Sequence, residues 1–516
     1  MNIKKMNILS SVGSFGFLTL ISRVLGYIRD ILIAIFLGTS FLADAFFVAF
    51  RLPNTFRRLF AEGSFNSAFV PQYSKLDIKK KAFEFANSVF NLLIFFLFVL
   101  VCVAEVFMGG VIYIISPGFI ENPEKYNLAV TLSRIAFPFL LFVSLSSFYS
   151  AILNTKGRFA VAAAAPIILN LLLIASIFYA KFFDEELVYF MAWAVTLAGI
   201  LQLIMLAIYA KKYFTPKISF NFKISPDVKY FFKRLLPSIF SSGVMQINIL
   251  VGTVIASFQT SAVSYLYYAD RIYQLPLAIT GIAIGTVILP SLSKEIFQNK
   301  DGKNFFLQNR SIELSLFLSA PATVGIIMAT EPIISTLFGY GSFDQESIRQ
   351  TSKALFVFGF GLPAFSLLKI YSSFYFARGN TKFPFYVSVL TVIMNILISI
   401  ILFNRLGFVS IALGTTISCW CAILIYQFFL LTNGMHKFDK IFAIRVSKIF
   451  VCSFIMSSIL SFLLFKFQFA FEHGSIHKIF SLTVIVGISA IIYFLLSILF
   501  KSFSIKDFKM KNYDTK

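Results

Sequence analysis

Charged residues, and the side chains that most often perform chemistry, are scarce in this chain. Of its 516 residues 13% are charged and 58% are hydrophobic, and there are only three histidines and four cysteines. An ordinary soluble domain carries about 25% charged residues. The composition therefore excludes such a domain and indicates a protein embedded in a membrane.

The cysteines and histidines do not form a pattern typical of a metal or redox site. The cysteines all lie in apolar segments, where a free cysteine behaves as a small hydrophobic residue: Cys102, Cys419, Cys421 and Cys452. His473 and His477 are four residues apart, like a metal-binding pair on a helix, but two ligands in a loop do not complete a site. We therefore expect no metal ion and no cofactor.

Long apolar runs are abundant. Runs of about 20 residues predict fourteen transmembrane helices, and no connection between them is long enough to hold a soluble domain. The expected helices lie near residues 9–37, 41–70, 85–112, 129–153, 160–180, 188–210, 231–258, 264–292, 311–330, 353–376, 384–403, 407–431, 446–466 and 479–500. The sequence therefore predicts an all-α polytopic membrane protein.

The basic residues are distributed unevenly between the loops. The formal net charge is +22, and lysines and arginines fall in every second connection between the expected helices. The intervening loops, such as SPGFIENPEKY (116–126), are neutral or acidic. By the positive-inside rule, both termini and the basic loops face the cytoplasm. This pattern explains the positive charge without a nucleic-acid partner.

Short matches between the two halves indicate an internal repeat. Leu52-Pro53 matches Leu275-Pro276 at a separation of 223, and Asn154-Thr155-Lys156 matches Asn380-Thr381-Lys382 at 226. A third match joins VPQYSK (70–75) to LPSLSK (289–294). We expect two six-helix lobes, 1–222 and 223–435, in parallel repeat around an axis along the membrane normal. Residues 436–516 then hold two extra helices, expected to pack beside the second lobe, and a cytoplasmic tail; chance matches remain the alternative.

Charged side chains interrupt several of the apolar runs. A charge at the centre of a bilayer helix costs about 2.5–3.5 kcal/mol, so such residues need a solvated cavity, a partner or a ligand. Arg23 and Asp30 lie seven residues apart on one helical face, and Asp44, Arg51 and Arg58 repeat that spacing. The full set comprises Arg23, Arg29, Arg51, Arg57, Arg58 and Arg271 against Asp30, Asp44, Glu62 and Asp270.

Six positive against four negative charges predict a cationic cavity. Arginine stays protonated, and its planar fork binds phosphate oxygens through two parallel hydrogen bonds. These residues are therefore candidates for binding an anionic phosphate group. The alternative is that they only pair with one another, or lie at the cytoplasmic surface.

Five longer segments form recognisable motifs: SRVLGYIRD (22–30), ADAFFVAFRLPNTFRRLFAEGSFNSAFVP (43–71), AILNTKGRFAVAAAAPIILN (151–170), YYADRIYQLP (267–276) and GTVILPSLSK (285–294). These motifs resemble those of one known family, the MurJ (MviN) lipid II flippases of bacteria. The resemblance implies a fold of the multidrug/oligosaccharidyl-lipid/polysaccharide exporter superfamily. It also implies that the protein is a transporter in the bacterial cytoplasmic membrane and not an enzyme.

The resemblance further implies a substrate and roles for individual residues. The substrate would be lipid II, an undecaprenyl-diphosphate-linked disaccharide-pentapeptide moved to the periplasmic leaflet by alternating access. Arg23, Arg29 and Arg271 would bind the diphosphate, with Asp44 and Arg57 in supporting positions. Arg51, Arg58, Asp30 and Asp270 complete the expected site. We expect a functional monomer whose partners are lipid II and membrane lipids.

Other functions remain as alternatives. A flippase for another polyprenyl-diphosphate-linked saccharide would show much the same arginines. A cation or drug antiporter of the same superfamily would need intramembrane carboxylates without matching arginines. A membrane transferase would need a cluster of Asp, Glu or His at one membrane face. Some relatives bind sodium, but here the corresponding segments offer Gln246, Asn248 and Asn395 and no carboxylate.

Overall fold

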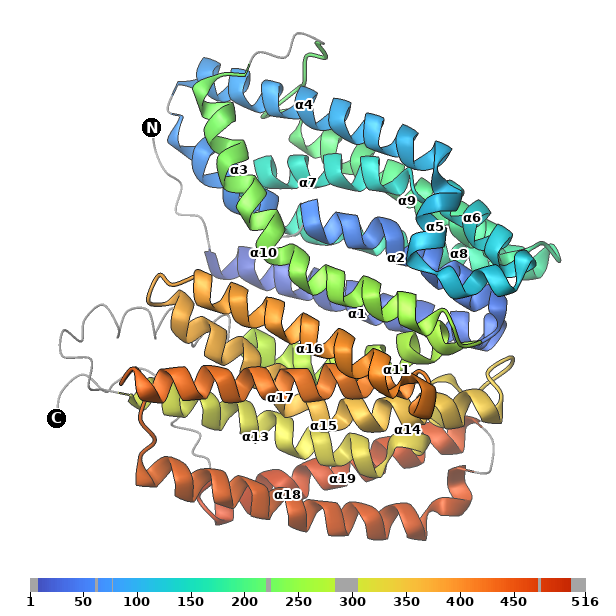
Figure 1. Ribbon diagram of the computed structural model, residues 1–516, viewed down its shortest axis with the longest axis vertical. Coiled ribbons are helices and arrows are strands. Elements are labelled where there is room, and N and C mark those ends of the chain that lie inside the picture. Colours follow the sequence, from blue (N-terminus) through green and yellow to red (C-terminus); the bar gives the residue numbers. More distant parts are fainter. Residues whose placement is uncertain are drawn as a thin grey trace. The chain divides into compact units, whose positions relative to one another are not determined.

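The computed structural model describes residues 8–60, 64–76, 78–219, 224–283, 305–471 and 475–502. These residues form eighteen α-helices and two short 3-10 helices (Figure 1). The chain divides into two compact units, 1–264 and 265–516, which are described separately below. The lobe boundaries expected from the repeat stay a prediction. Glu62 and the motif at 285–294 lie outside the described residues.

The first unit holds the helices up to α10 and the start of α11. Its elements are α1 (Ile8–Leu37), α2 (Phe41–Phe60), α3 (Ser64–Lys75), α4 (Lys79–Val106), α5 (Met108–Ile115), η1 (Pro117–Glu121), α6 (Pro123–Ala136), α7 (Phe139–Thr155), α8 (Phe159–Phe182), α9 (Leu187–Ala210) and α10 (Pro226–Ala256). α1 packs along α8, and α10 packs against α2 and α3. Among the charged helices, α1 is therefore held by α8, and α2 by α10.

The second unit holds most of α11 and all later helices. They are α11 (Ala262–Ala283), α13 (Phe306–Met328), α14 (Thr330–Phe338), α15 (Gln345–Phe376), α16 (Lys382–Leu406), α17 (Val409–Thr432), α18 (Lys440–Lys466), η3 (Gln468–Phe471) and α19 (Ser475–Leu499). α15 packs against both α13 and α17, and α16 pairs with α17.

Ten helical stretches among the described residues are long and apolar enough to cross a membrane. They run over residues 80–106, 123–155, 159–182, 187–210, 306–328, 345–376, 382–406, 409–432, 440–466 and 477–499. The prediction of an all-helical polytopic membrane protein is confirmed. The other four expected spans correspond to α1, to α2 with α3, to α10 and to α11, and each of these carries charged side chains.

Two of the expected helices are interrupted. The run near 85–112 divides into α4 and α5 at Phe107, just before two glycines at 109 and 110, which have low helix propensity. The run near 129–153 starts earlier, at Pro123, and divides into α6 and α7 at Phe137. Pro138 follows this break and has no N–H to continue the helical hydrogen bonds.

Phenylalanine builds the core of the first unit. Phe69 of α3 is fully buried, and its ring centroid lies 5.2 Å from that of Phe148 of α7 and 5.5 Å from that of Phe85 of α4. Phe231 of α10 joins the same cluster, with its centroid 5.6 Å from that of Phe65. Edge-on and offset ring pairs at these distances stabilise the packing beyond simple burial. The cluster fixes α3, α4, α7 and α10 against one another.

The last two long helices pack against α13. Phe317 of α13, Cys452 and Met456 of α18, and Tyr493 of α19 share one buried cluster, and the Tyr493 hydroxyl donates to the Phe317 carbonyl oxygen at 2.8 Å. Near one end of the same interface, Arg445 of α18 forms an ion pair at 3.4 Å with a buried Glu313. The expectation that these helices pack beside helices of the 223–435 segment is therefore confirmed.

Candidate functional site

The best defined part of the candidate site surrounds Arg29 on α1. Its guanidinium is 5% exposed and binds the neighbouring Asp30 carboxylate through Nε at 3.0 Å and Nη2 at 2.6 Å. Nη1 donates to the side-chain oxygen of Asn170 on α8 at 2.9 Å. The ring of Phe50 on α2 lies 5.5 Å from the guanidinium carbon. Three helices therefore surround this one buried cation.

The arginines of α2 have a different setting. Arg51 is partly buried and donates from Nη1 to the Thr253 hydroxyl of α10 at 2.5 Å. Arg57 donates from Nε to the side-chain oxygen of Asn54 at 3.3 Å, and Arg58 is also partly buried. Arg23 of α1 is exposed, and no described residue forms a hydrogen bond or ion pair with it. Together α1 and α2 carry five arginines and two aspartates, a net charge of +3.

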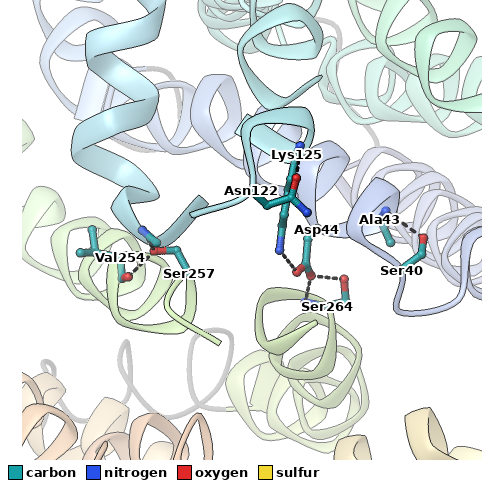
Figure 2. A network of polar contacts seen from close by, with 9 residues as sticks. Ser40, Ala43, Asp44, Asn122, Lys125, Val254, Ser257 and Ser264 are labelled. Carbon is teal, nitrogen blue, oxygen red and sulfur yellow. Dashed lines mark hydrogen bonds and ion pairs between the residues drawn. The ribbon is translucent and has the colours of Figure 1, made fainter. Parts of the chain in front are cut away.

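A second buried ion pair lies where α2 begins (Figure 2). Asp44 is fully buried, and one of its oxygens accepts a hydrogen bond from Lys125 Nζ of α6 at 2.6 Å. The other oxygen accepts from the backbone N–H of Ser264 at 2.9 Å and from its hydroxyl at 2.5 Å. Ser264 lies in the first turn of α11, where the helix dipole favours a negative charge. Lys125 Nζ also lies 4.0 Å from the centroid of the Phe119 ring.

The 3-10 helix η1 approaches the end of α10 very closely beside this pair. The Gly118 backbone N–H donates to the Ser257 hydroxyl at 3.0 Å. That hydroxyl donates to the Val254 carbonyl oxygen at 2.7 Å (Figure 2). A Cβ atom on Gly118 would lie only 2.3 Å from the Ser257 carbonyl oxygen. Glycine is therefore required at 118 by the close approach of two backbones.

The candidate residues of the second unit lie on α11. Arg271 is partly buried, donates from Nη2 to the Tyr267 hydroxyl at 2.8 Å and has its guanidinium carbon 4.7 Å from the centroid of that ring. Asp270 accepts a hydrogen bond from the Gln274 amide one turn later. Because Arg271 belongs to the second unit, its convergence with Arg23 and Arg29 stays a prediction.

His436 makes a separate polar junction in the loop between α17 and α18. The ring is 2% exposed, and Nε2 lies 2.9 Å from the side-chain oxygen of Asn309 on α13, so Nε2 donates and Nδ1 is unprotonated. Burial lowers the pKa of His436 to about 4, and the nearby Arg378 acts in the same direction. The loop histidine is therefore neutral at physiological pH.

Two residues that the structure brings to these sites, Asn170 and Lys125, were not among those predicted from the sequence. Asn170 is the only polar side chain between Phe159 and Ala175, which is a signal that a polar partner lies nearby. Lys125 lies in a loop expected to be neutral or acidic, and its partner is 81 residues away in sequence. No group of three or more His, Cys, Asp or Glu side chains that could hold a metal occurs within the described ranges.

Comparisons with known proteins agree on one family. A family model described as "Lipid II flippase MurJ" matches residues 33–482. The chain is 35% identical to a "Probable lipid II flippase MurJ" of Rhizobium tropici, over 96% of this chain and 94% of the relative. It is 33% identical to the "Lipid II flippase MurJ" of Burkholderia cenocepacia, over 82% and 83% of the two chains.

Solved structures give the same result at the level of the fold. A structure described as "Lipid II flippase MurJ, inward closed conformation" superimposes with a TM-score of 0.80 and 28% identity, covering 94% of this chain and 98% of the other. An inward-facing MATE family transporter of the MOP superfamily gives a TM-score of 0.65 at 17% identity, covering 83% and 95%. The MATE transporter therefore shares the fold alone. This chain belongs to the lipid II flippase MurJ family of multi-pass membrane transporters.

Proposed function

We propose that this chain moves lipid II from the cytoplasmic to the periplasmic leaflet of the bacterial cytoplasmic membrane. Support comes from the family match over residues 33–482 and from relatives of that description along nearly the whole chain. The same match favours lipid II over another polyprenyl-linked saccharide. A drug or cation antiporter is disfavoured because α1 and α2 carry a net charge of +3, which suits an anionic cargo.

The burial of Arg29 is the main observation that supports the proposed mechanism. An arginine that is 5% exposed on a helix of a membrane protein places a positive charge away from bulk water. A diphosphate offers several oxygens that can accept paired N–H bonds from such a group. In the proposed mechanism Arg23, Arg29 and Arg271 bind the diphosphate. Asp30 orients Arg29, and Asp44 and Asp270 have supporting positions. Arg51, Arg57 and Arg58 raise the local positive potential.

The proposed architecture adds detail to the ten candidate spans found among the described residues. It has fourteen transmembrane helices in two six-helix lobes related by a parallel repeat, with two further helices at the end. Both termini face the cytoplasm, and the protein acts as a monomer. Alternating access would then expose the arginines first to the cytoplasmic and afterwards to the periplasmic leaflet.

Complementation of a bacterial strain depleted of its own flippase tests this function. The measured quantity is the fraction of lipid II that an externally added, membrane-impermeant enzyme can cleave. The wild-type chain should restore cleavage, whereas R29A and R271A should not, and R29K should restore little because lysine lacks the planar fork. R349A is the matched control, since Arg349 is exposed and pairs only locally with Glu346 at 3.0 Å. Full exposure of lipid II in the R29A strain would contradict the proposal.

A further inference from the structure

The environment of Asn170 is unusually specific for a side chain in an apolar helix. Asn170 is 6% exposed, and both ends of its carboxamide are engaged by α1. Its oxygen accepts from Arg29 Nη1 at 2.9 Å, and its Nδ2 donates to the Ser22 carbonyl oxygen at 2.8 Å. If the carboxamide were reversed, its NH₂ group would face the N–H groups of Arg29 and its oxygen would face the Ser22 carbonyl oxygen, and neither contact could form a hydrogen bond. The two partners therefore fix the orientation of the carboxamide.

The same contacts restrict the orientation of the Arg29 guanidinium and the N–H groups that it can offer to a ligand. A guanidinium has five N–H groups. Asp30 takes two of them, from Nε and Nη2, and Asn170 takes one from Nη1. Among the residues that the structure describes, no partner takes the second N–H of Nη1 or of Nη2, so these two groups can serve a ligand. Without Asn170 the Nη1 side of the guanidinium would lose its fixed partner and could rotate about the Asp30 contact.

We propose that Asn170 is a positioning residue that fixes the guanidinium plane of Arg29, so that the two remaining N–H groups face the diphosphate of the cargo. The inference rests on the proposed function. A pre-oriented arginine loses less freedom when it binds, and it discriminates between a diphosphate and a single phosphate better than a mobile one. Asn170 thereby links α8 to the cargo without contacting it.

The test measures binding of two probe lipids, undecaprenyl diphosphate and undecaprenyl monophosphate, to the full chain in nanodiscs. Their tails are the same, so the ratio of the two affinities reports the headgroup alone. N170A should weaken diphosphate binding about tenfold and monophosphate binding much less, so that the ratio falls. The double variant R29A/N170A should bind the diphosphate no more weakly than R29A, because Asn170 acts through Arg29.

N91A is the matched control. Asn91 of α4 is also 6% exposed and also donates to a backbone carbonyl oxygen, that of Lys217 at 3.0 Å, but it forms no hydrogen bond with an arginine of the described ranges. N91A should lower the melting temperature as N170A does and leave both affinities within about twofold of wild type. If N170A does not fold, the isosteric N170D serves instead. It places a second carboxylate on Arg29 and should weaken diphosphate binding at least as much.

The outcomes separate the two proposals. The positioning role would be overturned if N170A kept the wild-type affinity ratio. It would also be overturned if R29A/N170A bound the diphosphate more weakly than R29A by the same factor as N170A does relative to wild type. Either result would leave the proposed function intact. Wild-type diphosphate binding by R29A would overturn the arginine site itself, and the role of Asn170 with it.

Discussion

The buried Lys125–Asp44 pair should contribute strongly to the stability of the first unit. The Lys125 and Asp44 side chains are 7% and 0% exposed, and their charged atoms lie 2.6 Å apart. Replacing Lys125 with Met removes the charge and shortens the side chain by one atom. Among the described residues, the buried Asp44 carboxylate then keeps the Ser264 donors alone. Removing one partner of a buried pair typically costs about 3–5 kcal/mol.

The corresponding shift in melting temperature can be estimated from the size of the unit. One kcal/mol shifts the melting temperature of a unit of about 250 residues by about 2 °C, so K125M should lower it by about 6–10 °C. D44N should have a comparable effect, because it leaves the lysine without its counter-charge. In the double variant K125M/D44N neither charge is left uncompensated. The double variant should therefore lose less unfolding free energy than the sum of the losses in the two single variants, by at least about 1 kcal/mol.

The measurement is thermal unfolding of the purified protein in one detergent at one pH. R349M is the control, because the exposed Arg349–Glu346 pair has 62% and 50% exposed side chains and should contribute at most about 1 kcal/mol. If K125M melts within 1–2 °C of wild type, or if the single losses add fully in the double variant, the pair does not stabilise the unit in the way inferred from its burial.

Three further predictions follow from individual contacts. Because the folded pKa of His436, about 4, lies below its ordinary value of 6.5, the unfolded state binds more protons between these values. Stability should fall by up to about 3 kcal/mol as pH drops from 6.5 to 4; melting curves of H436Q should lose this part of the acid sensitivity. G118A should lower the melting temperature by several degrees because of its backbone clash, while G110A, which has open space around it, should not. Y493F should cost about 1 kcal/mol through its lost bond to α13, measured by the same unfolding assay, and an unchanged value would show that the bond is replaced.

The sequence by itself determined that this is a helical membrane protein of the MurJ family. Apolar runs of sufficient length specify membrane helices directly, because lipid offers no partner for an unpaired backbone. The motifs at 22–30 and 43–71 indicated the family and identified Arg29, Asp30 and Asp44 as candidate site residues. Hydropathy did not reveal the breaks at Phe107 and Phe137, because the residues next to each break, 106–108 and 136–139, are all apolar and the run continues across it.

Only the tertiary structure decided which partners these charges have. Asn170 lies 141 residues from Arg29 in sequence, and Lys125 lies 81 residues from Asp44, so no local spacing links them. Periodicity assigns a side chain to one face of its own helix, whereas the partner depends on which helix packs against that face. The close packing of α1 with α8, and of α2 with α6, brings these residues together. The cost of burying an unpaired charge is the physical reason that such partners are present.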